Sequence, residues 1–140
     1  MCVILVCPPK VRPDIDVLRA CHAANPHGAG VGWRHGGKVH WQKNLGPEEV
    51  SKLIAKLDGE LVIHFRWASV GGVQPQLCHP FPVDRGASTK LEGKAARLLF
   101  HNGTWSGHKS ALEFVEAKQK RKVGGPLSDR FAYRYRHDLG

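Results

Sequence analysis

The sequence predicts an α+β fold with a mostly antiparallel sheet, formed by one domain that spans residues 1–140. Three observations lead to this prediction. Apolar segments of strand length are interspersed along the chain with segments of helical spacing. At least one hairpin pattern lies among them, and hairpins join antiparallel strands. The chain contains no internal repeat or linker, and 140 residues is the length of one domain.

The first two predicted elements are a short strand and a helix. Val3–Val6 is an apolar run that ends before Pro8 and Pro9. Residues 14–24 repeat apolar side chains at helical spacing, and Asp14 is a suitable cap for the start of this helix.

The middle of the chain predicts a hairpin, a second helix and the strongest strand. Two β-forming runs over 31–42 flank a His-Gly-Gly turn. Pro47 starts a helix because proline fits the first helical turn, and Gly59 is expected to end it. Residues 60–69, with the sequence ELVIHFRWAS, read as a strand that contains a structural, partly buried histidine.

The second half of the chain is richer in loops. Residues 70–77 and 84–96 predict loops, and the prolines of 78–83 exclude a central strand there. Residues 97–103 predict a strand that ends in a turn. Helical spacing and a basic end predict a third helix over 107–122, and a capping serine predicts a short final helix.

The composition narrows the class of protein. There are 21 Lys and Arg residues against 12 Asp and Glu residues, a formal net charge of +9. This balance favours an acidic partner such as nucleic acid, an acidic protein face or an anionic substrate, but a soluble basic surface also accounts for it. No secretory signal and no apolar run of about 20 residues is present, so we expect a cytoplasmic protein outside the membrane.

The four cysteines are expected to stay reduced in that compartment. They lack the CxxC spacing of a zinc site, so we expect no metal and no other cofactor. A zinc site formed by Cys78, His79 and His101 remains a lower-ranked alternative.

Cys2 is the first residue that suggests catalysis. Removal of Met1 leaves a free α-amino group on Cys2, beside the thiol of the same residue. This amine can accept the thiol proton and activate the nucleophile without a separate histidine. On position alone, the sequence favours the simpler interpretation that Cys2 is the first residue of a strand.

Three later stretches contain polar groups suited to binding an amino-acid amide. Arg66 ends a strand with a guanidinium that can bind a carboxylate in a bidentate manner, and Ser69 adds a hydroxyl. Asn102 and Gly103 supply adjacent donors for an oxyanion hole, and Asp129 can bind an ammonium group. Each also has an ordinary explanation: a surface ion pair, a common Asn-Gly turn and a first-turn acid favoured by the helix dipole.

Taken in this order, the stretches resemble the class II glutamine amidotransferase family of N-terminal-nucleophile hydrolases. The matching stretches are MC at the start, NPHGAGVG at 25–32, HFRWASVGG at 64–72, HPF at 79–81, HNG at 101–103 and SD at 128–129. The resemblance runs in short islands from Met1 to Asp129. It is strongest to the small stand-alone members found in bacteria and phages.

This resemblance implies a four-layer αββα sandwich of antiparallel sheets and a glutaminase reaction. Cys2 would attack the side-chain amide of glutamine or a related amide, form a thioester and release ammonia. Asn102 and Gly103 would stabilise the oxyanion. The substrate would be held by Arg66, Ser69, Gly71, Gly72, Asp129 and, near the pocket rim, His79.

The chain departs from the family pattern at its C-terminal end. The family continues with further strands after its SD motif, whereas this sequence ends at Gly140. The resemblance then implies either a truncated form or a sheet completed by a partner chain or a second copy. No synthase domain that could use the ammonia is present in the sequence. We therefore expect either an acceptor subunit that takes the ammonia or a different amide substrate.

A second hypothesis is a non-catalytic basic module on the same fold that contacts nucleic acid or an acidic protein. Basic residues interleaved with aromatic ones suit single-stranded nucleic acid. They are Lys118, Lys120, Arg121, Lys122, Arg130, Tyr133, Arg134, Tyr135 and Arg136.

Overall fold

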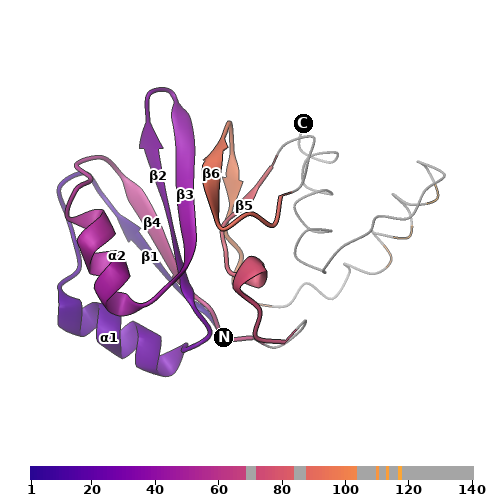
Figure 1. Ribbon diagram of the computed structural model, residues 1–140, viewed down its shortest axis with the longest axis horizontal. Helices are drawn as coiled ribbons and strands as arrows, with labels where there is room; N and C mark the ends of the chain where they lie inside the picture. Colours follow the sequence, from indigo (N-terminus) through magenta and orange to yellow (C-terminus); the bar gives the residue numbers. More distant parts are fainter. Residues whose placement is uncertain (69–71, 84–87, 104–109, 111–112, 114–116, 118–140) are drawn as a thin grey trace.

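The computed structural model describes residues 1–68, 72–83 and 88–103, together with 110, 113 and 117. This part of the chain is a mixed α+β structure with two antiparallel sheets and two α-helices (Figure 1). The predicted α+β class and antiparallel pairing are therefore confirmed. Only residues 110, 113 and 117 of the helix predicted over 107–122 are described. The helix predicted after Ser128 and the basic cluster of the second hypothesis lie outside the described residues.

The larger sheet has five strands in the order β1-β4-β2-β3-β6, and all neighbouring strands are antiparallel. Its central strand pair places Gly30 opposite His64, and Ile4 faces the same His64 from the other side. The strands are β1 (Val3–Cys7), β2 (Ala29–His35), β3 (Lys38–Leu45), β4 (Leu61–Phe65) and β6 (Glu92–Ala95).

Two helices, α1 (Ile15–Ala24) and α2 (Pro47–Ile54), cover one face of this sheet (Figure 1). The Asp14 carboxylate accepts a hydrogen bond from the Val17 N–H at 2.9 Å, which confirms the predicted cap. Burial of the apolar helix stripes against the sheet forms the main core, because apolar area removed from water stabilises the fold by about 25 cal/mol per Å². The fully buried core side chains include Leu18, Val31, Val50, Ile63 and Phe65.

Helix α2 ends at Ile54, so the expected end at Gly59 is wrong. The backbone tightens after Ile54, where Lys56 and Leu57 donate to carbonyls three residues back. The Arg12 guanidinium, from the loop after β1, donates to the carbonyls of Ile54 and Leu57. A distant side chain thus adds hydrogen-bond donors to the carbonyls at the end of the helix and just beyond it.

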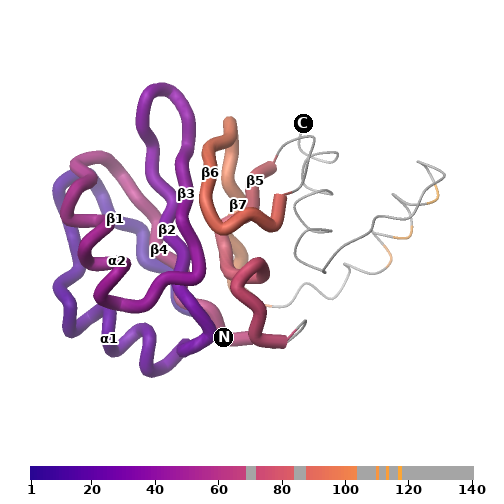
Figure 2. Tube along the Cα trace, viewed as in Figure 1, coloured from indigo at the N-terminus to yellow at the C-terminus, as the bar shows by residue number. Residues whose placement is uncertain are grey.

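The opposite face of the sheet carries a second, two-stranded sheet of β5 (Phe81–Pro82) and β7 (Leu98–Leu99) (Figure 2). Two glycines of β2 allow this close approach. A Cβ on Gly30 would lie 1.7 Å from the carbonyl oxygen of His79, and one on Gly32 would lie 2.8 Å from the Phe100 ring. The described residues therefore form a helical layer, a five-stranded sheet and a smaller sheet.

A buried lysine fixes the segment that leads into β5. The Lys43 ammonium donates to the Gln76 carbonyl at 2.9 Å, within the short 3-10 helix η1 (Pro75–Leu77). The same ammonium lies 4.3 Å from the centre of the Phe81 ring, a distance suited to a cation–π contact. The segment that contains His79 is thereby held against β3.

Part of the predicted loop 84–96 is instead strand β6, so that prediction is wrong for 92–95. Glu92–Ala95 has no alternating apolar pattern, and it is a strand because its backbone pairs with the edge of β3. Gly93 leaves room for the Trp41 ring, which would approach a Cβ there to 2.6 Å. Across the pair, the Gln42 amide donates to the Glu92 carboxylate at 3.0 Å.

Within the part of the chain that is described, no helix combines the length and apolar character needed to cross a membrane.

Candidate active site

Cys2 and Asn102 meet at one end of the sheet although 100 positions separate them in the chain. The Cys2 backbone N–H donates to the Asn102 side-chain oxygen at 2.9 Å. In return, the Asn102 side-chain nitrogen donates to the Cys2 carbonyl at 2.8 Å. Cys2 directly precedes β1, and Asn102 follows β7, so both sheets contribute one residue to the site.

The Cys2 thiol is held by the chain that leaves β4. The Trp67 backbone N–H donates to the Cys2 sulfur at 3.3 Å, and the thiol lies 3.7 Å from the Trp67 carbonyl oxygen. The sulfur is therefore fixed on both sides by one peptide segment. Met1 is 94% exposed, so the residue that covers the Cys2 nitrogen is accessible to an aminopeptidase.

The segment around Trp67 is positioned by the residues just before β2. The His27 N–H donates to the Arg66 carbonyl, and the Arg66 N–H donates to the Gly28 carbonyl. The His27 ring accepts the Ala68 N–H at 2.8 Å and lies 5.3 Å from the Trp67 ring. His27 thus holds the segment that holds the thiol.

The sequence contained a signal for these two contributors. Both residues lie inside stretches that carry the family resemblance, NPHGAGVG and HFRWASVGG. Neither residue was assigned a role. The His27 ring accepts a backbone N–H, and Trp67 contacts Cys2 through its own backbone, so residue type alone does not reveal either contact.

Arg66, the predicted carboxylate-binding residue, is buried with 5% of its surface exposed. Its guanidinium donates to the Gly72 carbonyl at 2.8 Å. Gly72 has φ +71°, a conformation that favours glycine. The structure therefore brings Arg66 and Gly72 together beside the segment that contacts Cys2, whereas Ser69, Gly71 and Asp129 lie outside the described residues.

Gly103, the second predicted oxyanion donor, is exposed and has φ +97°. An ideal Cβ at this position would meet no atom within 4 Å. The space beside the Asn102 turn is therefore open among the described residues, and the glycine is needed for its backbone conformation rather than for packing.

Two histidines whose rings contact each other at a tilt of 41° lie beside the Asn102 turn. His64 is fully buried, and its Nε2 lies 3.1 Å from the His101 carbonyl oxygen. A carbonyl only accepts, so this nitrogen carries the proton and Nδ1 does not. The His79 ring lies 4.4 Å from the His64 ring and 4.8 Å from the Phe81 ring. His64 therefore holds the residue that directly precedes Asn102, and His79 packs against it.

Burial keeps both rings neutral. Desolvation lowers the pKa of His64 to about 4, with the hydrogen bond to His101 acting in the opposite direction. Desolvation likewise lowers the pKa of His79 well below its ordinary value, and the neighbouring His64 lowers it further. The Nδ1 atoms of both rings lack a hydrogen-bond partner among the described residues. A proton added here would thus place charge in a region that cannot solvate it.

Cys78, part of the alternative zinc site, makes a different contact. Its thiol donates to the His27 carbonyl at 3.4 Å, and burial raises the pKa of this thiol. Burial thus disfavours the thiolate, which is the form in which a cysteine binds zinc. Within the described ranges, no cluster of three or more His, Cys, Asp or Glu side chains is arranged to hold a metal ion.

A pocket of about 420 Å³ lies beside the same end of the molecule. It is lined by His22 and by residues of 26–28, 44–46 and 73–75. The pocket therefore borders the His27 segment that positions Trp67.

Comparisons with known proteins give no relative. No family model, no curated protein and no solved structure matches this chain. The function must therefore be inferred from the geometry of the site and from the sequence motifs.

Proposed function

We propose that the protein is a glutamine-type amidohydrolase that uses Cys2, after removal of Met1, as an N-terminal nucleophile. The observation that carries this proposal is the pair of hydrogen bonds between the Cys2 backbone and the Asn102 side chain, at 2.9 and 2.8 Å. The family resemblance implies that Cys2 is the nucleophile and that Asn102 is an oxyanion donor. Their contact supports both roles, because an oxyanion donor must lie beside the nucleophile that attacks the amide carbon.

The contact also suits the chemistry after processing. The Asn102 oxygen that accepts the Cys2 N–H would orient the free α-amine in the same place. The Asn102 amide nitrogen has two hydrogens, and the Cys2 carbonyl takes one of them. The other hydrogen, together with the Gly103 N–H, is available for an oxyanion.

The reaction then proceeds in two steps. The α-amine takes the thiol proton, and the sulfur bonds to the amide carbon while the carbonyl oxygen becomes an oxyanion. The oxyanion collapses, the carbon–nitrogen bond breaks, and the amine returns the proton to the leaving group, which departs as ammonia. Water attacks the resulting thioester with the amine again as base, releasing the carboxylic acid and restoring the thiol.

We also propose that Arg66, Ser69, Gly71, Gly72, His79 and Asp129 bind the substrate, and that the whole domain is a four-layer αββα sandwich. The position of Arg66 directly before Trp67, whose backbone contacts the Cys2 sulfur, supports the first proposal. The helical layer and two antiparallel sheets of the described residues support the second. The protein would act in the cytoplasm on glutamine or a related amide, and pass ammonia to an acceptor subunit.

The test combines a glutaminase assay with mass spectrometry of the intact protein. We expect loss of the Met1 mass, ammonia release from glutamine or a related amide, and no release by Cys2→Ala. Cys21→Ala is the matched control, because Cys21 is a half-buried thiol in α1. Either retained Met1 or unchanged activity in Cys2→Ala would overturn the mechanism.

The hypothesis of a non-catalytic basic module remains a prediction, since the basic cluster on which it depends lies outside the described residues. Binding to single-stranded nucleic acid that weakens with salt would support it.

A further inference from the structure

A second pocket, of about 380 Å³, lies between the two sheets at the other end of β4. Cys2 is near the Phe65 end of this strand, whereas the pocket is lined by Glu60, Leu61 and Val62 at its start. The four residue steps from Leu61 to Phe65 span about 13 Å. The pocket is thus separate from the candidate active site.

The strand register shows which side chains of the larger sheet border this pocket. Gly32 pairs with Val62, and Arg34 pairs with Val39. Side chains alternate between the faces of a sheet, so all four residues face the second sheet. Gly32 contributes no side chain to that face, and the Leu98 and Phe100 side chains approach the position its Cβ would take to 2.9 and 2.8 Å. The glycine therefore lets Leu98 and Phe100 pack closely against the sheet, and all three residues line the pocket.

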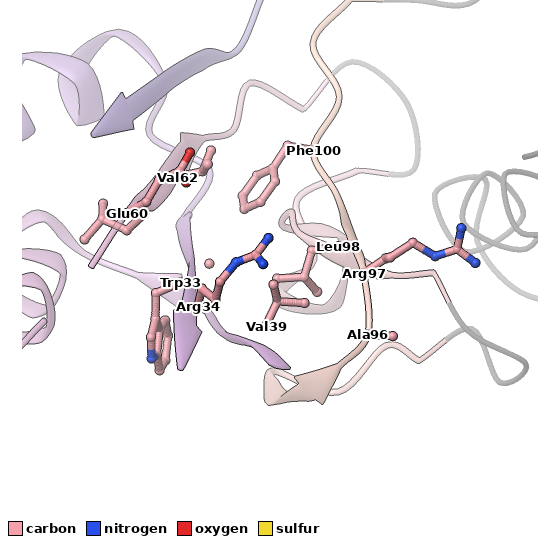
Figure 3. Close-up of a pocket in the computed structure, with 11 residues that line it drawn as sticks. Trp33, Arg34, Val39, Glu60, Val62, Ala96, Arg97, Leu98 and Phe100 are labelled. Atoms are coloured by element: carbon pink, nitrogen blue, oxygen red, sulfur yellow. The ribbon is translucent and has the colours of Figure 1, made fainter. Parts of the chain in front are cut away.

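One arginine enters this apolar space. Figure 3 shows the Arg34 side chain directed into the pocket toward Phe100 and Leu98, whereas the Arg97 side chain points away from it. The Arg34 side chain makes no hydrogen bond or ion pair with another described residue. Glu60 also lines the pocket and forms no ion pair with Arg34. The guanidinium is therefore available to an anion at the edge of an apolar surface.

We propose that this pocket binds a small amphipathic carboxylate. Its apolar body would lie against Val62, Leu98 and Phe100, and its carboxylate would accept hydrogen bonds from Arg34. A planar guanidinium matches a carboxylate in a bidentate manner. Ligand pockets of about 300–1,000 Å³ hold small organic molecules in an apolar lining with a few polar groups. This proposal does not depend on the proposed glutaminase activity.

The test uses isothermal titration calorimetry on the full chain with 1-naphthylacetic acid and its neutral amide. The two probes share an apolar body and differ only in the charged group. We expect the acid to bind at least about tenfold more tightly than the amide, the difference that one charge-assisted hydrogen bond makes. Arg34→Gln should remove this preference, and Arg97→Gln, whose native side chain points away, should keep it.

Both substitutions are at exposed positions, so the variants are expected to fold. Cys2→Ala protein should bind the acid as the wild type does, which separates this site from the active site. Equal binding of acid and amide, equal weakening by Arg34→Gln and Arg97→Gln, or no saturable binding of the acid would overturn the proposal.

Discussion

Mild acid is expected to destabilise the protein through the buried histidine His64. Its pKa is about 4 in the folded protein, against about 6.5 in an unfolded chain. Between these values the unfolded state binds a proton that the folded state does not, so stability falls as the pH falls. The loss is absent above pH 7, about 2 kcal/mol at pH 5 and about 3 kcal/mol at pH 4. His79, whose pKa is lowered in the same direction, adds to this loss.

Urea unfolding followed by tryptophan fluorescence at pH 7.5, 6.5, 5.5 and 5.0 measures the effect. His64→Gln keeps a side-chain N–H for the His101 carbonyl but does not titrate. The difference in free energy of unfolding between wild type and this variant should therefore change by about 2 kcal/mol from pH 7.5 to 5.0. His35→Gln, at an exposed position at the end of β2, is the control and should leave the pH dependence unchanged. A wild-type-minus-His64→Gln difference that stays constant with pH would refute the reasoning.

Three further substitutions test separate contacts. Gly30→Ala places a Cβ 1.7 Å from the His79 carbonyl oxygen, so we expect a loss of about 3 kcal/mol or more in urea unfolding, and a change below 0.5 kcal/mol would contradict this packing. Arg12→Ala removes the guanidinium from the carbonyls at the end of α2 and should lower the free energy of unfolding by about 2 kcal/mol. Arg12→Lys should recover only part of this loss, because an ammonium lacks the forked geometry of the guanidinium. Equal stability of Arg12→Lys and the wild type would show that the fork geometry is irrelevant. Asn102→Ala should lower the glutaminase kcat by a factor of about 10²–10³, because it removes an oxyanion donor. Cys2 should still react with iodoacetamide in this variant. Full activity would show that Asn102 does not stabilise the oxyanion.

Local sequence signals predicted much of the first half of the fold. Asp14 caps α1 and Pro47 begins α2 because these residues act on their own helix. Gly36 and Gly37, both with positive φ, form the turn between β2 and β3. Such features depend on chemistry within a few residues, so the sequence alone is sufficient to find them.

The wrong or missing predictions involve partners far apart in the chain. The end of α2 depends on Arg12, and β6 is a strand through pairing with β3 rather than through its own pattern. Neither contact leaves a periodic signal in the sequence.

In the candidate site, too, some features were predicted from the sequence and others depend on contacts between distant residues. Cys2 and Asn102 were assigned together through the family resemblance, and the structure brings them into contact. The Trp67 backbone contacts and the ring contact between His64 and His79 were not predicted, because they are produced by tertiary packing.

Reaction with a diazoketone analogue of glutamine, followed by peptide mass spectrometry, tests the central claim most directly. The account predicts one covalent adduct, on the sulfur of Cys2, in protein that has lost Met1. Glutamine should slow the labelling, because both compounds occupy the same pocket. Labelling of Cys7, Cys21 or Cys78 instead, or no labelling of a protein that has lost Met1, would contradict the assignment of Cys2 as the nucleophile.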